Sequence, residues 1–280
     1  MKRKVRRFCL FFVFSMLPFL LYSIESISEN SEKKERTVSV NGVDIVIVYI
    51  PAGEFLMGSQ ETEEGRRTDE GPQHRVVINK DFWMGKYEVT RGQWIAVMGE
   101  DEAWFEGGNN YPVEWLSWNE SQDFIKKLNE KTGLKFRLPT EAEWEHACRA
   151  GTTTPFHYGE SISSDQANFN GNYPYGGAKK GVYLETTCPV GSFQLNAWGL
   201  YDMHGNVWEW CEDVYKADIY NHPELYTKNS IGNPVYSGEG LYRVIRGGGW
   251  LGNSNQLRSA SRASYSYAQN YVGFRLVLDD

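Results

Sequence analysis

Helical patterning in this chain is confined to three short segments, and each segment begins with a capping box. The boxes pair a hydroxyl residue with Gln or Glu three positions later, at Thr90–Gln93, Ser117–Glu120 and Thr140–Glu143. In a capping box both side chains accept hydrogen bonds from otherwise unpaired backbone N–H groups, which stabilises a helix start by roughly 1 kcal/mol. Apolar residues at helical spacing follow each box, and the segments close at Gly99, at Gly133 and near Gly151. We therefore assign these hydroxyl residues to structure and not to nucleophilic catalysis.

After Gly151 the helical periodicity is lost, and Gly, Asn, Tyr and Pro dominate. Strands are predicted from Val38 to a turn at Pro51, at Arg243–Arg246 and at Val272–Leu278. The chain has 28 Gly and 15% aromatic residues, which is typical of an irregular fold whose core is filled by large rings. We predict one α+β domain that is loop-rich, with short helices and small antiparallel sheets.

The first residues have a different composition from the rest of the chain. A cluster of Lys and Arg precedes an apolar run from Phe8 to Tyr22, which is short for a bilayer span and typical of an export signal. We predict a signal peptide at residues 1–26, with an uncleaved anchor as the alternative, a linker at 27–37 and a single domain at 38–280. The expected location is the periplasm, the cell surface or the medium, with no stable membrane span once the signal is cleaved.

Charge and cysteine content restrict the partners. The net charge of −7, without a basic patch after the first residues, argues against a nucleic-acid partner. The mature chain keeps Cys148, Cys188 and Cys211, an odd number without a CxxC motif. In an oxidising compartment two of them could pair, and their spacing does not say which.

The segment GLYDMHGNVWEW, from Gly199 to Trp210, concentrates polar chemistry. Its candidate cation ligands are the carboxylates of Asp202 and Glu209 and the backbone carbonyls of Gly205 and Val207. Calcium favours such all-oxygen sets. The alternative is that Asp202 caps a turn, Gly205 supplies a positive φ angle and the tryptophans fill the core.

Five blocks of sequence together resemble the formylglycine-generating enzyme (sulfatase-modifying factor) family, whose fold is related to the C-type lectin fold. The blocks are IPAGEFLMGS, KYEVTRGQW, RLPTEAEWEHACRAG, GLYDMHGNVWEW and RVIRGGGW with GFRLV. The resemblance covers nearly the whole mature chain and implies a formylglycine-generating-enzyme-like fold. It also implies calcium at Asp202, Gly205, Val207 and Glu209. A second family calcium site begins at Asn168 and Phe169, but its carboxylate position falls on Val182.

The chain departs from this family at the catalytic site. Formylglycine-generating enzymes bind Cu(I) through two cysteines that follow an RGGSW motif and use O2 to oxidise a substrate cysteine. The matching positions here are Gly252 and Leu257, and the serine of the motif is Gly249. Other side chains do not readily replace a thiolate pair at Cu(I). We therefore predict no catalytic residues and no copper.

The segment between Trp250 and Gly273 is rich in Ser, Asn, Tyr, Ala and Gln, which are residues of adaptable recognition surfaces. Its predicted ligand-binding residues are Leu251, Gly252, Asn253, Asn255, Ser264, Tyr265, Ser266, Tyr267 and Tyr271. The alternative is an ordinary solvated loop. Arg258, Arg262 and Arg275 are expected to pair with buried acids and not to contact a ligand.

Two functions from different classes remain open. The first is an exported, non-catalytic binding protein for a protein, peptide or glycan, with calcium stiffening its loops. The second is an oxidoreductase that acts on a sulfatase cysteine through an atypical copper site. Since some members of this family are variable proteins of diversity-generating retroelements, diversification of the C-terminal segment is a further hypothesis.

Overall fold

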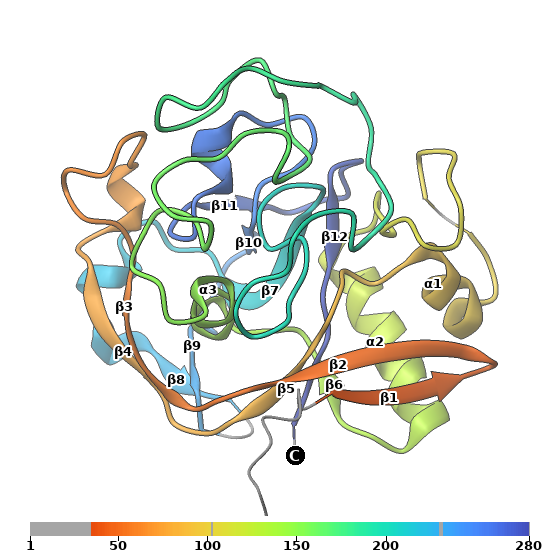
Figure 1. The fold of residues 1–280 in the computed structure, drawn as a ribbon. Coiled ribbons are helices and arrows are strands. Elements are labelled where there is room, and N and C mark those ends of the chain that lie inside the picture. Colours follow the sequence, from red (N-terminus) through yellow and green to blue (C-terminus); the bar gives the residue numbers. More distant parts are fainter. Residues whose placement is uncertain (1–34, 102, 230–231, 280) are drawn as a thin grey trace, which may run out of the picture. The chain divides into compact units, whose positions relative to one another are not determined.

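The computed structural model describes residues 35–101, 103–229 and 232–279, so the predicted signal peptide lies outside the described residues. The larger of its two main sheets has five strands in the order β1-β2-β5-β13-β6, and all neighbours are antiparallel (Figure 1). These strands are β1 (Glu35–Val40), β2 (Val43–Ile50), β5 (Phe82–Gly85), β13 (Val277–Leu278) and β6 (Phe136–Arg137). Residues 35–37, within the predicted linker, thus form part of β1. A turn with positive φ at Asn41 and Gly42 joins β1 to β2, as tight hairpins require.

The second main sheet has four strands in the order β11-β10-β7-β12. Its strands are β11 (Arg262–Tyr265), β10 (Arg243–Arg246), β7 (Trp208–Val214) and β12 (Val272–Phe274). The β7–β12 pair is parallel, in contrast to the antiparallel pairing predicted. The strand predicted at Val272–Leu278 is divided, because β12 belongs to this sheet and β13 to the five-stranded sheet. Two hairpins complete the strands: β3 (Gly53–Met57) with β4 (His74–Ile78), and β8 (Thr227–Lys228) with β9 (Pro234–Val235).

All three predicted helices are confirmed, and each has both hydrogen bonds of its capping box. They are α1 (Arg91–Met98), α2 (Trp118–Thr132) and α3 (Glu141–Arg149). Gly99 and Gly133 end the first two in the left-handed conformation, whereas Ala150, at φ 45°, ends the third. The described 3-10 helices are η1 (Thr68–Glu70), η2 (Ile219–Asn221), η3 (Pro223–Leu225) and η4 (Ser254–Leu257). None of the described helices is long and apolar enough to cross a membrane.

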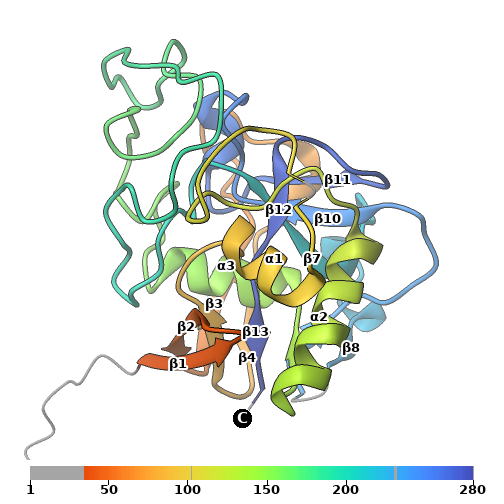
Figure 2. The same cartoon turned by 90° about the vertical axis from the view of Figure 1, so that its right-hand side faces the viewer.

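Large aromatic side chains fill the core between the sheets and helices. Trp94 of α1 stacks on Phe124 of α2 with ring centroids 5.4 Å apart, and Phe124 meets Phe274 of β12 at 5.3 Å. Figure 2 shows α1 and α2 side by side, in agreement with their contact. Helix α3 is buried along its whole length in a second cluster. In Figure 1 the loops between α3 and β7 lie mostly on the side of the sheets away from β1 and β2.

Candidate functional site

The candidate site is a pocket of about 300 Å³ beside the four-stranded sheet. Its walls come from the start of β7, the loop that follows β10, strand β11 and the residue before β12. The lining residues are Trp208, Gly249, Leu251, Gly252, Asn253, Gln256, Ala263, Tyr265 and Tyr271. None of these side chains is charged at neutral pH, so the pocket offers aromatic faces and neutral hydrogen-bonding groups.

The structure brings part of the predicted ligand-binding set together in this pocket. The predicted residues that line it are Leu251, Gly252, Asn253, Tyr265 and Tyr271, whereas Asn255, Ser264, Ser266 and Tyr267 do not line it. Ser264 lies on the opposite face of β11 from Tyr265, because successive side chains of a strand alternate.

Sequence reasoning missed four lining residues: Trp208, Gly249, Gln256 and Ala263. Ala263 stands two residues before Tyr265 in β11, so strand periodicity would have found it. Gln256 lies within the polar segment between Trp250 and Gly273, from which the other ligand-binding residues were predicted. Trp208 was assigned to the core alone, and it is indeed packed in the main core cluster while its edge also lines the pocket.

Two glycines make room for the pocket. A Cβ atom on Gly252 would lie 2.2 Å from Oε1 of Gln256, so the glycine allows this amide to fold back over the pocket. A Cβ atom on Gly249 would lie 3.2 Å from the carbonyl oxygen of Tyr271 and 3.3 Å from Cδ1 of Trp208. The resembled family has a functional cysteine at the position of Gly252 and a serine at the position of Gly249. Glycine is smaller than either residue, so these two substitutions enlarge the free space.

The two positions that match the family's copper ligands have separate environments. Gly252 lines the pocket, while Leu257 is fully buried in a small apolar cluster with Phe156, Phe169 and Tyr175. Neither residue has a side-chain atom that can bind copper. The carbonyl oxygen of Leu257 instead accepts a hydrogen bond from Nδ1 of His204 at 2.6 Å.

The three described cysteines are buried free thiols, so the structure contains no disulfide among them. Burial raises the pKa of Cys148 and of Cys188 to about 12, and it raises the pKa of Cys211 well above its usual range. Thiolates are the form that binds metals. Burial thus favours the protonated thiol at all three positions.

The residues predicted to hold calcium do not all fit that role. Both carboxylate oxygens of Glu209 are already engaged: Arg275 Nη2 lies 2.8 Å from Oε1, and Trp144 Nε1 donates to Oε2 at 2.7 Å. Asp202 and Gly205 have positive φ angles of 57° and 94°, which bends the segment as the turn interpretation predicts. Among the described residues, no three His, Cys, Asp or Glu side chains gather as a metal site.

Asp202 nonetheless keeps an open oxygen. Its Oδ2 accepts from the backbone N–H of Gly191 at 2.6 Å, while no donor reaches Oδ1. The carboxyl of Glu88 is also buried: its Oε1 accepts from Nδ2 of Asn206 at 3.1 Å, and its Oε2 has no hydrogen-bond partner. Burial raises the pKa of Asp202 to about 6 and raises that of Glu88 well above its usual range. The raised pKa of Glu88 favours its protonated, neutral form, while the charge of Arg275 lowers the pKa of both groups.

The second, weaker calcium position is also only partly suited to a metal. Asn168 is buried and donates through Nδ2 to the carbonyl of Thr186 at 2.9 Å, which leaves its Oδ1 without a partner. The side chain of Phe169 lies in the apolar cluster with Leu257. Val182, at the family's carboxylate position, is 63% exposed and offers no ligand atom from its side chain.

Buried arginines fix the C-terminal segment to the scaffold, and the predicted pairing of three of them with acids is confirmed. Arg258 contacts Glu70 at 2.7 Å, Arg262 contacts Glu141 at 2.7 Å, and Arg275 contacts Glu209 at 2.8 Å. All three are fully buried. They therefore contribute to the support of the site and not to its open surface.

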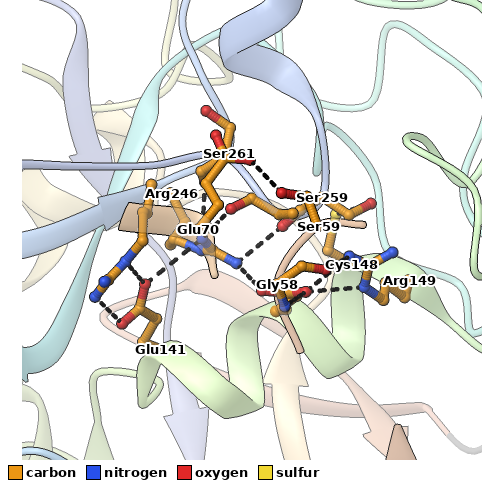
Figure 3. A network of polar contacts seen from close by, with 12 residues as sticks. Gly58, Ser59, Glu70, Glu141, Cys148, Arg149, Arg246, Ser259 and Ser261 are labelled. Atoms are coloured by element: carbon orange, nitrogen blue, oxygen red, sulfur yellow. Dashed lines mark hydrogen bonds and ion pairs between the residues drawn. The ribbon is translucent and has the colours of Figure 1, made fainter. Parts of the chain in front are cut away.

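A fourth buried arginine, Arg246 at the end of β10, was not predicted. It pairs with Glu145 of α3 and donates to the carbonyl oxygens of Ser259, Ala260 and Ser261 at 2.9, 3.0 and 2.8 Å. Figure 3 shows this network, in which Arg246 lies among Glu141, Ser259 and Ser261. The Arg246 guanidinium thus binds three consecutive carbonyl groups shortly after the segment that forms the pocket.

Comparison with known proteins agrees with this fold. The profile of the sulfatase-modifying factor enzyme 1-like domain matches residues 31–280. The serine/threonine-protein kinase pkn1 of Chlamydia caviae is 31% identical over 272 residues, which cover 88% of this chain but 40% of that protein. The chain therefore spans two fifths of that relative. The formylglycine-generating enzyme of Streptomyces coelicolor is 32% identical over 223 residues, with 74% of this chain and 67% of the enzyme covered.

Solved structures show the same architecture. PvdO from Pseudomonas aeruginosa superimposes with a TM-score of 0.73 at 30% identity, covering 89% of this chain and all of PvdO. Treponema denticola variable protein 1 superimposes with a TM-score of 0.67 at 23% identity, covering 88% and 99% of the two chains, and supports the fold. The fold is that of formylglycine-generating enzymes and related C-type-lectin-like proteins. The chain belongs to the family of sulfatase-modifying factor enzyme 1-like domains.

Proposed function

We propose that the protein is an exported, non-catalytic member of its family that binds a ligand in the pocket of its C-terminal segment. The observation that carries this proposal is the replacement of both copper-ligand positions, by Gly252 in the pocket and by Leu257 in a closed apolar cluster. A family member without the thiolate pair keeps the scaffold and the cavity but lacks the means to activate O2. The site can therefore still bind a ligand.

The alternative is a formylglycine-generating oxidoreductase with an atypical copper site. A copper-supplemented assay of the purified protein with a Cys-x-Pro-x-Arg peptide tests it directly, with aldehyde formation read by mass. The Streptomyces coelicolor enzyme serves as positive control. We expect no conversion by this protein under conditions in which the control converts the peptide; conversion would contradict the non-catalytic assignment.

Calcium is proposed to bind at Asp202, with the carbonyl oxygens of Gly205 and Val207. The buried Oδ1 of Asp202, which has no hydrogen-bond partner, supports this role. Carboxylate and carbonyl oxygens suit calcium. Glu209 already pairs with Arg275 and is not proposed as a ligand.

Export and diversification also remain proposals. Export rests on the charged and apolar pattern of residues 1–26. Diversification of the C-terminal segment would place variable side chains such as Asn253 and Tyr265 in the pocket, and Tyr267 on an exposed surface. Sequencing the neighbouring DNA tests it, because a reverse-transcriptase gene and a near-copy of the 3′ end of this gene must both be present.

A further inference from the structure

The pocket selects against charged ligands. None of its lining side chains is charged at neutral pH, and Arg258, Arg262 and Arg275 are buried in pairs with acids. A phosphate, a carboxylate or an ammonium group would lose its hydration here without gaining an opposite charge, which is unfavourable. Its volume of about 300 Å³ lies at the lower end of small-ligand sites. A ligand that fits is therefore neutral, and about as large as one ring.

Two phenol groups give the pocket a paired hydrogen-bonding edge. The hydroxyl of Tyr271 donates to that of Tyr265 at 2.7 Å. A tyrosine hydroxyl has one proton and two acceptor lone pairs, so the Tyr265 proton and an acceptor position on Tyr271 stay available. Neighbouring hydroxyl groups on a sugar ring are about one hydrogen-bond length apart and can meet both phenols at once.

Amide groups and an aromatic edge complete the lining. Asn253 and Gln256 bring side-chain amides to the pocket, and Gly252 leaves room for the Gln256 amide. The edge of Trp208 provides an apolar surface on the same pocket. A sugar ring has hydroxyl groups around its rim and C–H bonds on its faces, so it matches both kinds of surface.

An exposed pair of tryptophans is joined by a backbone hydrogen bond to the segment that leads into the pocket residue Tyr271. The rings of Trp104 and Trp115 are 4.7 Å apart, and they are 60% and 41% exposed. The backbone N–H of Trp115 donates to the carbonyl of Gln269, two residues before Tyr271. Trp115 has a φ of 63°, which is uncommon for a bulky residue and is typical of positions held by function.

We propose that the pocket binds a terminal residue of a neutral saccharide and that Trp104 and Trp115 stack against the residue next to it. This inference rests on the proposed binding function and names its ligand class. The pocket supplies neutral hydrogen bonds to one ring, and the tryptophan pair supplies apolar area for a second. Recognition thus requires no charge on the ligand.

The test uses the purified full chain and two series of probes. The first contains methyl glycosides of glucose, galactose, mannose and N-acetylglucosamine, and the second contains neutral disaccharides of the same sugars. Saturation-transfer NMR detects binding, and titration gives the dissociation constants. We expect saturable binding of at least one monosaccharide and tighter binding of a disaccharide that contains it.

Three variants locate the site. Tyr265→Phe keeps the ring but loses the hydroxyl, so we expect about tenfold weaker binding of the sugar. Tyr267→Phe makes the same change at an exposed tyrosine outside the pocket and should leave binding within about twofold. Trp104→Ala should remove the gain from the second sugar while leaving monosaccharide binding intact. Melting temperatures check that each variant is folded.

The outcomes separate this inference from the proposed function. The absence of binding by every sugar in both series overturns the saccharide assignment, as does binding that Tyr265→Phe leaves unchanged. In either case the non-catalytic binding function stands. Aldehyde formation in the copper-supplemented peptide assay would instead overturn the proposed function itself.

Discussion

The guanidinium of Arg258 meets the carboxylate of Glu70 through two parallel hydrogen bonds, with Nη1 2.8 Å from Oε2 and Nη2 2.7 Å from Oε1. The two residues are separated by 188 positions in the chain. Ser59, which Figure 3 shows near Glu70, also donates to Glu70 at 2.9 Å, and all three side chains are buried. This contact fastens the residue next to Leu257 to the loop between β3 and β4.

Glu70→Gln should therefore be strongly destabilising. The variant leaves the Arg258 charge buried with only Glu63 as an acidic partner, and breaking a buried pair in this way costs about 3–5 kcal/mol. Glu54→Gln is the matched control, because Glu54 pairs with Arg75 at an exposed position and the loss there is about 0–1 kcal/mol. Urea denaturation measures both. Equal losses of unfolding free energy in the two variants would show that the buried pair stabilises the fold no more than the exposed pair does.

Leu257→Ala tests whether the second copper-ligand position has become part of the core. Truncation of a fully buried leucine costs about 2–5 kcal/mol of unfolding free energy. The same substitution at Leu251, which is 50% exposed at the pocket, should change stability by about 0.5 kcal/mol or less. Denaturant unfolding compares the two. A small effect at Leu257 would contradict its placement in the apolar cluster.

Added calcium should raise the melting temperature of the protein by about 5–10 °C at a concentration one hundredfold above its dissociation constant. Asp202→Ala should abolish this difference between calcium and chelator. Glu209→Gln should lower stability by about 3–5 kcal/mol by leaving Arg275 unpaired, yet keep the calcium response. Differential scanning calorimetry with and without calcium distinguishes these effects. Loss of the response in the Glu209 variant alone would restore Glu209 as a ligand.

Acid should destabilise the fold through His157. Burial lowers the pKa of His157 from about 6.5 to about 4, so the unfolded chain binds a proton that the folded chain does not between these values. Stability is then highest above about pH 6.5 and is lost as the pH falls toward 4, by at most about 1.4 kcal/mol per pH unit for this group.

His157→Phe keeps an aromatic ring against His204, whose ring centroid lies 4.8 Å away, and removes the titration. Its stability should decline less than that of the unmodified protein between pH 6.5 and pH 4. Urea midpoints over this range provide the comparison. Parallel declines in the two proteins would show that His157 does not contribute to acid sensitivity.

The sequence was a good guide where the signal is local. Each capping box involves residues within one turn, so Thr90, Ser117 and Thr140 identify helix starts without knowledge of the rest of the fold. The polar segment after Trp250 was also recognised as a candidate surface, and several of its residues line the pocket.

Contacts between residues that are far apart in the sequence could not be predicted in the same way. The spacing of Asp202 and Glu209 indicated a shared cation, but Arg275, 66 residues further on, takes up the Glu209 carboxylate. The same arginine falls between β12 and β13, so a run predicted as one strand serves two sheets. Local patterns carry no information about such competing long-range contacts.

Strand β13 joins two parts of the larger sheet that come from distant parts of the chain. This strand, at residues 277–278, pairs with residues 83–84 of β5 on one side and with residues 136–137 of β6 on the other. Without β13, neither β5 nor β6 has a strand that connects it to the other within this sheet. The sheet is therefore completed by contacts between residues far apart in sequence, and a high share of such contacts makes folding slow.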